Sequence, residues 1–469
     1  MKLNTDICIV GAGATGLTLA HQLLKAGKNV VLIERSERIG GLAKSFHYEG
    51  GHTFDTGPKR FHTNDEEVLS FINEIADSQL TQIKRYSALH YQGRIIDWPL
   101  SPATLLNLPF KVCVKSLIDQ LFFPYNAEIK SFEDLVLKRY GRTLAESFFR
   151  PYTEKFLKIP ANQTHRDWAH LGINRTVVDR EASSILGVAK DLIPFVRKPD
   201  ENFYYPTQGG FGGFFEKIFE VLKTYPNFVA LTGQKVQTIE HCSEEGLNID
   251  TEKNQSVSAK KLVWTGNLNQ LLEASNLDSK TQKLMYLNTL LFNIIIKKKY
   301  VTLKNKKIQW LYISSGERLI SRISFPVEFH STNHHSDYYN FSVEVTSSKA
   351  LFQLNHGGKL NKLKDQVLAE LVQLGFITNV SSCDAINYEF IADSYPIYDL
   401  EYKKKFGGYQ KVINQFSNSI ILSGRTGSFW YNNSDHSIKM ALNLSKKILA
   451  NDNLTNEGNI EQDKEAIFS

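Results

Sequence analysis

The stretch GAGATG, residues 11–16, has the residue types and spacing of a turn that binds a phosphate group. Gly11, Gly13 and Gly16 permit a tight turn, close approach of a pyrophosphate and packing of a helix on a strand. The first N–H groups of the following helix attract negative charge. Glu34 ends the next predicted strand about twenty residues later, where its carboxylate can accept hydrogen bonds from a ribose. The pattern predicts a dinucleotide site.

A second concentration of distinctive side chains lies in GRTGSFWYNNSDHSIKMAL, residues 424–442. Gly424 and Arg425 precede three aromatic residues and two asparagines, and Asp-His-Ser then opens an apolar pattern typical of a helix. A single Ser, Thr, Asp or Asn is enough to cap a helix. We therefore interpret the additional side chains as part of a ligand-binding site.

The elements that must position these residues can be predicted from hydrophobic periodicity. Residues 6–35 indicate a strand, a turn, an amphipathic helix and a second strand. Proline-interrupted helices are expected over about 65–200, and paired strands follow in KVQTIEHC, LNIDTE and SAKKLVWTG. LFNIIIKKKY, QWLYIS, RLISRISF and YNFSVEVTSS predict neighbouring strands of one sheet. Further helices are expected over about 360–374 and after Asp435.

Composition excludes several classes of protein. The net charge of +6 over 469 residues is mild and comes without a basic block, so we expect no nucleic-acid partner. The four cysteines include no CxxC pair, which indicates neither structural disulfides nor a metal site. No apolar run reaches the ~18–20 residues that span a bilayer, and the N-terminus lacks a signal-peptide pattern. These features predict a cytoplasmic protein without a membrane span.

The residues that follow Glu34 distinguish FAD from NAD. ERSERIGGLAKSF and FDTGPKRFH resemble the extended FAD signature of the amine-oxidase-like flavoprotein superfamily, and LVWTG and the Gly424 to Asp435 segment resemble its return strand and C-terminal motif. The resemblance implies that FAD is bound by Gly11, Gly13, Ala14, Thr15, Gly16, Glu34, Arg35, Arg38, Gly41, Leu42, Gly57, Pro58, Lys59, Val236, Thr265, Gly424, Arg425, Asn433, Asp435 and Ser437.

More narrowly, the chain resembles UDP-galactopyranose mutases, with a Tyr/Arg set closer to the eukaryotic type. The resemblance rests on WLYISSGERLISRISF, SYPIYDLE, GRTGSFWY and PYTEKFLKIP followed by Trp168. It implies that a substrate diphosphate is held by Tyr312, Arg322, Tyr395 and Tyr431. Arginine meets phosphate oxygens in a two-pronged fork, and tyrosine hydroxyls add neutral donors.

The activity implied by this resemblance is a net non-redox isomerisation between pyranose and furanose forms of a nucleotide sugar. Reduced FAD would attack the anomeric carbon through N5, displace UDP and form a covalent sugar adduct, whose ring opens and recloses before UDP returns. The partners would be a UDP- or dTDP-linked sugar and an electron donor that reduces FAD.

The chain departs from the family at three places. Lys59 stands where the family has a histidine beside the flavin, and we expect it to bond the flavin or stabilise an anionic reduced form. Gly172 stands where the family has an arginine, so Arg175, three residues later, is expected to be a displaced substitute. The segment between Tyr431 and Asp435 is shorter than in the eukaryotic pattern, and Asn433 is expected there as a cofactor contact.

The predicted fold class is α/β, with a Rossmann-type FAD-binding domain interleaved with a helical domain and a mixed or antiparallel β-sheet substrate domain. FAD-binding segments are expected at 1–85, 201–288 and 401–450, the helical domain at 86–200, the substrate domain at 289–400 and a loose tail at 451–469.

Two other functions are compatible with the same superfamily. One is an FAD-dependent oxidoreductase of the amine oxidase or protoporphyrinogen oxidase type, which needs no Tyr/Arg diphosphate clamp. The other is a binding protein of the Rab-escort or GDP-dissociation-inhibitor type, which does not use FAD as a catalyst. The set of Glu34, Arg38, Gly41 and Asp435 favours a flavin-binding enzyme over the latter.

Overall fold

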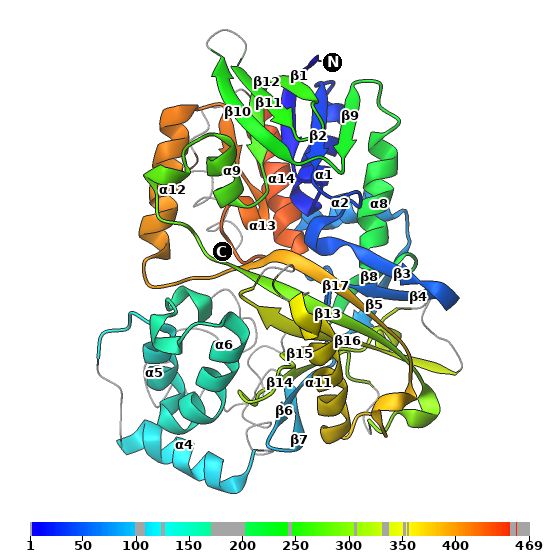
Figure 1. The fold of residues 1–469 in the computed structure, drawn as a ribbon, viewed down its shortest axis with the longest axis vertical. Coiled ribbons are helices and arrows are strands. Elements are labelled where there is room, and N and C mark those ends of the chain that lie inside the picture. The colour runs from blue at the N-terminus through cyan, green and yellow to red at the C-terminus, as the bar shows by residue number, and fades with distance from the viewer. Residues whose placement is uncertain are drawn as a thin grey trace.

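Two large β-sheets form the two halves of the molecule in the computed structural model of the chain (Figure 1). The residues described are 2–98, 108–122, 127–169, 202–242, 246–303, 307–330, 337–349, 353, 356–450 and 456. Over these residues each large sheet has seven strands. The chain passes repeatedly between the halves, because segments far apart in sequence share each sheet.

The first sheet contains the predicted strand–turn–helix–strand unit. Its order is β10-β11-β12-β1-β2-β9, and β18 pairs with the second half of β12. Around β1 the pairing is parallel, which suits strands whose side chains are buried on both faces. The bounds are β1 (Lys2–Val10), β2 (Val30–Glu34), β9 (Phe228–Thr232), β10 (Val236–Cys242), β11 (Gly246–Thr251), β12 (Ser256–Trp264) and β18 (Ile420–Leu422).

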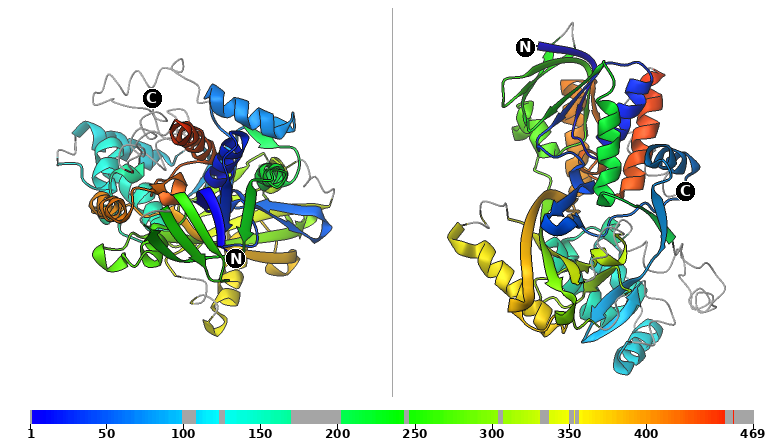
Figure 2. Two further views of the ribbon diagram at one scale, coloured as in Figure 1. Left: turned by 90° about the horizontal axis from the view of Figure 1, so that it is seen from above. Right: turned by 90° about the vertical axis from the view of Figure 1, so that its right-hand side faces the viewer.

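Helices cover both faces of this sheet, as Figure 2 shows from two further directions. On one face Leu17 and Leu23 of α1 share a core with Ile438 and Leu442 of α14. On the other face a second core joins the sheet to α9 and α12. The helices of this half are α1 (Ala14–Lys25), α2 (Glu66–Ala76), α8 (Gly210–Leu222), α9 (Leu268–Ala274), α12 (Tyr402–Phe416), α13 (Gly424–Gly427) and α14 (Ser434–Leu449).

The second sheet confirms the four neighbouring strands expected from the sequence. Its order is β17-β13-β16-β15-β14-β6-β7, and every pair is antiparallel except β14 with β6. Helix α11 (Lys359–Gln373) packs on it through Val367 and Leu371. The bounds are β6 (Ser87–Tyr91), β7 (Arg94–Trp98), β13 (Tyr286–Lys297), β14 (Trp310–Ile313), β15 (Arg322–Ser324), β16 (Tyr338–Ser347) and β17 (Cys383–Pro396).

Over the described residues the remaining elements are two small sheets and three α-helices. Two small antiparallel sheets pair β3 (Ser45–Tyr48) with β4 (His52–Asp55) and β5 (Leu80–Lys84) with β8 (Asn202–Pro206). Helices α4 (Phe110–Phe122), α5 (Phe132–Leu144) and α6 (Arg150–Leu157) lie beside the second sheet. None of the helices in the described part of the chain has the length and apolarity that crossing a bilayer requires.

The expectation of mainly helical structure over about 65–200 is wrong for residues 80–98, which form β5, β6 and β7. Gln92 and Gly93 both adopt positive φ, 47° and 77°, and close the two-residue turn that joins β6 to β7. In the expected tail, Asn456 is held by the core, since its side chain accepts a hydrogen bond from Leu422 N at 2.9 Å.

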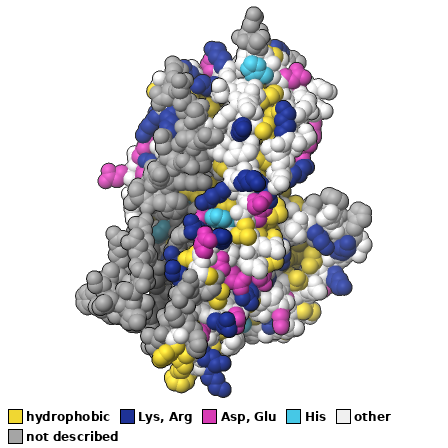
Figure 3. Space-filling view, turned by 90° about the vertical axis from the view of Figure 1, so that its left-hand side faces the viewer, with side chains coloured by type: hydrophobic (Ala, Val, Ile, Leu, Met, Phe, Trp, Pro, Cys, Tyr) yellow, Lys and Arg dark blue, Asp and Glu magenta, His cyan; other side chains and the backbone are white. Residues whose placement is uncertain are grey.

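On the side of the molecule drawn in Figure 3, basic and acidic side chains are intermixed. Hydrophobic side chains gather at the lower end of that view, where Figure 1 places α4. Phe110 and Phe122 at the two ends of α4 are 81% and 70% exposed.

Candidate active site

A single cavity of about 480 Å³ lies between the two large sheets and brings together residues from both. At one end it is lined by the glycine turn after β1 and by Glu34. At the other end it is lined by Lys59, Tyr312 and Arg322, with Tyr395 and Tyr431. The two groups of residues that the sequence predicted separately therefore share one space.

The glycine turn is shaped so that only glycine fits. Gly11 has φ of +107°, and a Cβ there would lie 2.2 Å from Thr265 Oγ1. A Cβ on Gly16 would lie 1.9 Å from the Gly11 carbonyl oxygen. Gly13 precedes α1, whose first turn has no acidic residue, and lines the cavity opposite Gly41. Free N–H groups of a helix N-terminus thus face an open space, as a pyrophosphate requires.

Glu34 is held rigidly at the end of β2. It is 8% exposed, and its two carboxylate oxygens accept hydrogen bonds from Ala12 N at 2.8 Å and Ser36 N at 2.9 Å. Each oxygen retains further acceptor capacity, so the carboxylate can also accept from a ribose hydroxyl. The residues at this end of the cavity fit the nucleotide half of FAD.

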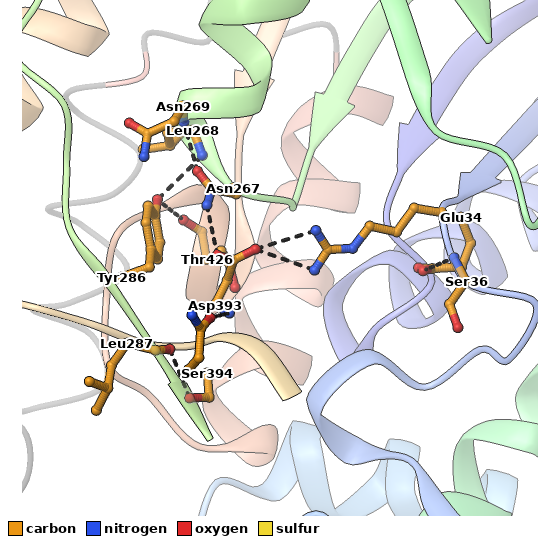
Figure 4. A network of polar contacts seen from close by, with 12 residues as sticks. Glu34, Ser36, Asn267, Leu268, Asn269, Tyr286, Leu287, Asp393, Ser394 and Thr426 are labelled. Carbon is orange, nitrogen blue, oxygen red and sulfur yellow. Dashed lines mark hydrogen bonds and ion pairs between the residues drawn. The ribbon is translucent and has the colours of Figure 1, made fainter. Parts of the chain in front are cut away.

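A polar network joins the two sheets beside this nucleotide end (Figure 4). Both terminal nitrogens of Arg35, which follows β2, donate to Asp393 Oδ2 of β17 at 3.3 Å. Asn267 Nδ2 donates to the other Asp393 oxygen at 2.9 Å. Arg35 and Asp393 both line the cavity, so the predicted cofactor residue Arg35 also pairs with the opposite half of the molecule.

The predicted Tyr312 and Arg322 face each other across the β14–β15 pair. The Arg322 guanidinium donates from Nε and Nη2 to the two oxygens of Glu344 at 2.6 and 2.7 Å, and Nη2 lies 3.2 Å from Tyr395 OH. Burial alone would lower the pKa of Arg322, but the Glu344 carboxylate and Tyr395 reverse this and raise it. The guanidinium is therefore a fixed cation.

Arg425 occupies the space between two of the predicted tyrosines. Its guanidinium carbon lies 4.9 Å from the ring centre of Tyr395 and 4.4 Å from that of Tyr431. Nη1 donates to Asn432 O and Nη2 to Ser394 O, both at 2.7 Å. Since both terminal nitrogens bind backbone carbonyls, Arg425 fixes the loop after α13 against β17.

The Tyr395 hydroxyl at this end stays neutral. Burial raises the pKa of Tyr395 above its ordinary value. Tyr395 meets Tyr431 edge to face at 5.1 Å, and Trp168 stacks on Tyr431 at 5.3 Å. The Tyr395 hydroxyl can thus act as a hydrogen-bond donor from a ring that cannot move freely.

The loop after β4 carries Lys59 into the cavity. Asp55 anchors the loop: its Oδ1 accepts from Ser45 Oγ at 2.5 Å and Phe211 N at 3.1 Å, and its Oδ2 accepts from Tyr205 OH at 2.6 Å. Burial, followed by repulsion from Arg425 and Arg322, lowers the pKa of Lys59 to about 7.

The structure brings most of the sequence-predicted residues to this cavity. The predicted residues that line it are Gly11, Gly13, Ala14, Thr15, Glu34, Arg35, Gly41, Leu42, Pro58, Lys59, Val236, Thr265, Tyr312, Arg322, Tyr395, Gly424, Arg425, Tyr431, Asn433 and Ser437.

Four predicted cofactor residues do not line the cavity. Gly16 packs beneath Gly11, Gly57 packs against Glu344, and Asp435 is buried in the first turn of α14. Arg38 is exposed. Arg175 lies outside the described residues, and its role stays a prediction.

Sequence reasoning missed several polar residues of the site. Glu344 could have been found, because a carboxylate within the apolar strand FSVEV needs a buried partner. Arg60 and Arg85 also line the cavity and lie 4.6 and 5.6 Å from the Trp310 ring, a contact without a sequence signal. Across the described ranges, no group of three or more His, Cys, Asp or Glu side chains could hold a metal ion.

Comparison with known proteins agrees with this geometry. The family described as flavin containing amine oxidoreductase matches residues 14–295. A probable UDP-galactopyranose mutase of Klebsiella pneumoniae is 30% identical over 168 residues, which cover 32% of this chain and 41% of the relative. A dTDP-fucopyranose mutase of Escherichia coli is 25% identical over 240 residues, covering 49% and 57%. The chain thus matches only about half the length of these curated relatives.

The fold is shared over nearly the whole chain with a crystal structure of reduced UDP-galactopyranose mutase. The TM-score is 0.82 at 20% identity, covering 98% of both chains. The predicted fold class and the predicted resemblance are confirmed.

Proposed function

This chain belongs to the flavin containing amine oxidoreductase family, and we propose that it uses bound, reduced FAD to interconvert the pyranose and furanose forms of a nucleotide sugar. One observation carries the proposal: the flavin-binding turn and the Tyr312, Arg322, Tyr395 and Tyr431 set line the same cavity. The similarity to a probable UDP-galactopyranose mutase and a dTDP-fucopyranose mutase supports a sugar linked to a nucleoside diphosphate.

The residues that line the cavity have two tasks, to bind the cofactor and to bind the substrate diphosphate. The glycine turn, Glu34 and the neighbouring lining residues would hold the dinucleotide, and a reduced flavin bound there would supply a nucleophile at N5. The tyrosine hydroxyls and the Arg322 cation hold the diphosphate, so that it stays beside the sugar and can return.

Arg322 is suited to this task by its pairing with Glu344. The Glu344 carboxylate accepts hydrogen bonds from Nε and Nη2 of Arg322. These bonds orient the guanidinium and leave its Nη1 to donate to a phosphate oxygen. Tyr395, 3.2 Å from the same guanidinium, adds a second donor. Prior alignment of such donors removes part of the entropic cost of holding the leaving group.

The alternative of an amine-oxidising oxidoreductase fits this end of the cavity less well. Two tyrosines that meet edge to face could surround a substrate ammonium group. In this chain the Arg425 guanidinium already occupies the faces of Tyr395 and Tyr431. A further cation beside Arg425 and Arg322 would be repelled.

Anaerobic incubation with nucleotide sugars tests the proposal. FAD-loaded protein reduced with dithionite should convert UDP-galactofuranose to UDP-galactopyranose, or the corresponding dTDP-linked fucose pair, as followed by chromatography. Oxidised protein is the control and should give no conversion. Turnover of amines or amino acids with oxygen uptake, without any sugar conversion, would replace the proposal with the oxidoreductase.

A further inference from the structure

Lys59, which the family resemblance places beside the flavin, is a titratable group of the cavity that takes no part in holding the nucleotide sugar in the proposed function. Pro58 and Lys59 line the end of the cavity that also contains Arg322 and Arg425. Within the part of the chain that the structure describes, the Lys59 amine has no hydrogen-bond or ion-pair partner. The half-buried amine is therefore open to a ligand, and charged groups with a perturbed pKa gather at functional sites.

Among the described residues, none of the charged groups nearest to Lys59 forms a hydrogen bond or ion pair with its amine. Arg425 and Arg322 repel it, while Glu344 and Asp55 attract it. Glu344 already accepts two hydrogen bonds from Arg322. Both oxygens of Asp55 are likewise occupied by neighbouring donors. An anion that enters the cavity is therefore the partner that Lys59 lacks.

The residues that line the cavity indicate which anion this is. A dinucleotide that places its ribose at Glu34 and its pyrophosphate at the glycine turn must extend toward the opposite end. That end is lined by Lys59. The isoalloxazine ring is the part of FAD that reaches it, and this ring gains negative charge on reduction.

The backbone holds Lys59 in this place. Gly57 has φ of +99°, and a Cβ there would lie 2.7 Å from Glu344 Oε1 and 3.3 Å from Arg322 Nη2. The loop is thus wedged against the Arg322–Glu344 pair at one side and anchored through Asp55 at the other. These contacts on both sides hold the loop that carries Lys59 at the cavity.

We propose that Lys59 stabilises the negative charge of the bound flavin after its reduction, and that the amine takes up a proton when this charge forms. Two electrons from a donor and one proton enter the flavin, and a second proton moves from solvent to the Lys59 amine. The proposal depends on a bound flavin and is independent of the sugar substrate.

The electrostatics of the loop make this proton uptake possible near neutral pH. In the structure burial lowers the pKa of Lys59 to about 7, so much of the amine is neutral at about pH 8. A negative charge within ~4–6 Å raises the pKa of an amine by about 1–3 units. Between the two pKa values, reduction of the flavin therefore draws one extra proton.

Spectroelectrochemical titration of the FAD-loaded protein tests this proposal. Between about pH 7.5 and 8.5 the wild type should take up about two protons for two electrons, as given by the pH dependence of the midpoint potential. Lys59→Met and Lys59→Arg should each take up about one, since neither side chain titrates there.

The midpoint potentials distinguish an effect of the Lys59 charge from an effect of its packing. Lys59→Met should bind FAD but have a lower midpoint potential, and its affinity for sulfite, which adds a negative charge to the oxidised flavin, should fall about tenfold or more. Lys59→Arg, which keeps the charge, should stay near the wild type. Lys283→Met is the control, since Lys283 pairs with Glu273 at the surface and does not line the cavity.

An unchanged potential and proton count in Lys59→Met would overturn the proposal. If Lys59→Met fails to retain FAD, the proton uptake of the wild type compared with that of Lys59→Arg still tests the proposal. Uptake of two protons for two electrons by Lys59→Arg would show that a group other than Lys59 titrates, and would overturn the proposal. Failure of sugar conversion alone would overturn only the proposed function, because the potential is measured without substrate.

Discussion

At the scale of single residues, the site depends on a cation that is fixed by a buried carboxylate. Glu344 is 1% exposed, and the Arg322 side chain is 13% exposed. Glu344→Gln should lower the free energy of unfolding by about 3–5 kcal/mol, because removing one charge leaves the other buried and unpaired. Chemical denaturation of the variant measures this loss.

The matched control is Glu389→Gln on β17, since Glu389 accepts a hydrogen bond from a neutral group, Tyr48 OH, at 3.1 Å. The free energy of unfolding of Glu389→Gln should fall by less than about 1.5 kcal/mol. Equal stability losses in the two variants would contradict the view that the Arg322–Glu344 charge pair is a principal support of the site.

Residue types with strong local requirements were the ones predictable from sequence. Gly11 and Glu34 follow from spacing, and Tyr312, Arg322, Tyr395 and Tyr431 follow from the family resemblance; all of them line the cavity. Arg60 and Arg85 do so as well, but their positions depend on how β5 and the loop after β4 meet Trp310. Contacts set by tertiary packing leave no periodic signal in the chain.

At the scale of elements, helix α6 holds the strand pair that carries the substrate residues. The ammonium of Lys155 on α6 donates to the carbonyl oxygens of Ile313, Ser315 and Ile320 at 2.5, 2.9 and 2.9 Å. These carbonyls lie in and after β14 and before β15, between Tyr312 and Arg322. Three donors on three carbonyls fix the turn that sets the spacing of the two side chains.

Lys155→Met should therefore loosen this turn selectively. Three buried carbonyls lose their donor, and the free energy of unfolding should fall by about 3 kcal/mol. Hydrogen exchange of β14 and β15 amides should accelerate about tenfold more than that of β13. Lys138→Met on the neighbouring α5 is the control, with a change within about 0.5 kcal/mol. Uniform acceleration across the sheet would contradict a local role.

Element prediction failed where a short turn, rather than periodicity, decided the structure. Residues 80–98 were expected within a helical region, yet β6 and β7 pair across the Gln92–Gly93 turn and extend the second sheet. A Gln-Gly turn is a weaker sequence signal than Asn-Gly. Long apolar strands such as β13 and β16, and the periodic helix α14, were predicted correctly because burial itself specifies them.

At the scale of the whole molecule, the two halves meet over the nucleotide end of the cavity through Arg35 and Asp393 (Figure 4). Asp393 has φ of +55° and its N–H donates to Asn288 Oδ1 at 3.0 Å. The Arg35 side chain is 44% exposed and that of Asp393 is 17% exposed. A partly exposed pair of this kind contributes about 0–1 kcal/mol and is weakened by salt. The Arg35–Asp393 ion pair is therefore weak enough to break and re-form.

Asp393→Asn should therefore speed the release of FAD without unfolding the protein. Asparagine tolerates the positive φ and keeps a contact to Asn267, but loses the charge that attracts Arg35. FAD dissociation, followed by recovery of flavin fluorescence, should become up to about fivefold faster at low salt, which corresponds to about 1 kcal/mol. Raising the ionic strength should speed release from the wild type and leave the variant unchanged. A wild type and variant with the same salt dependence would show that the cofactor leaves by a path that does not separate the two halves at Arg35.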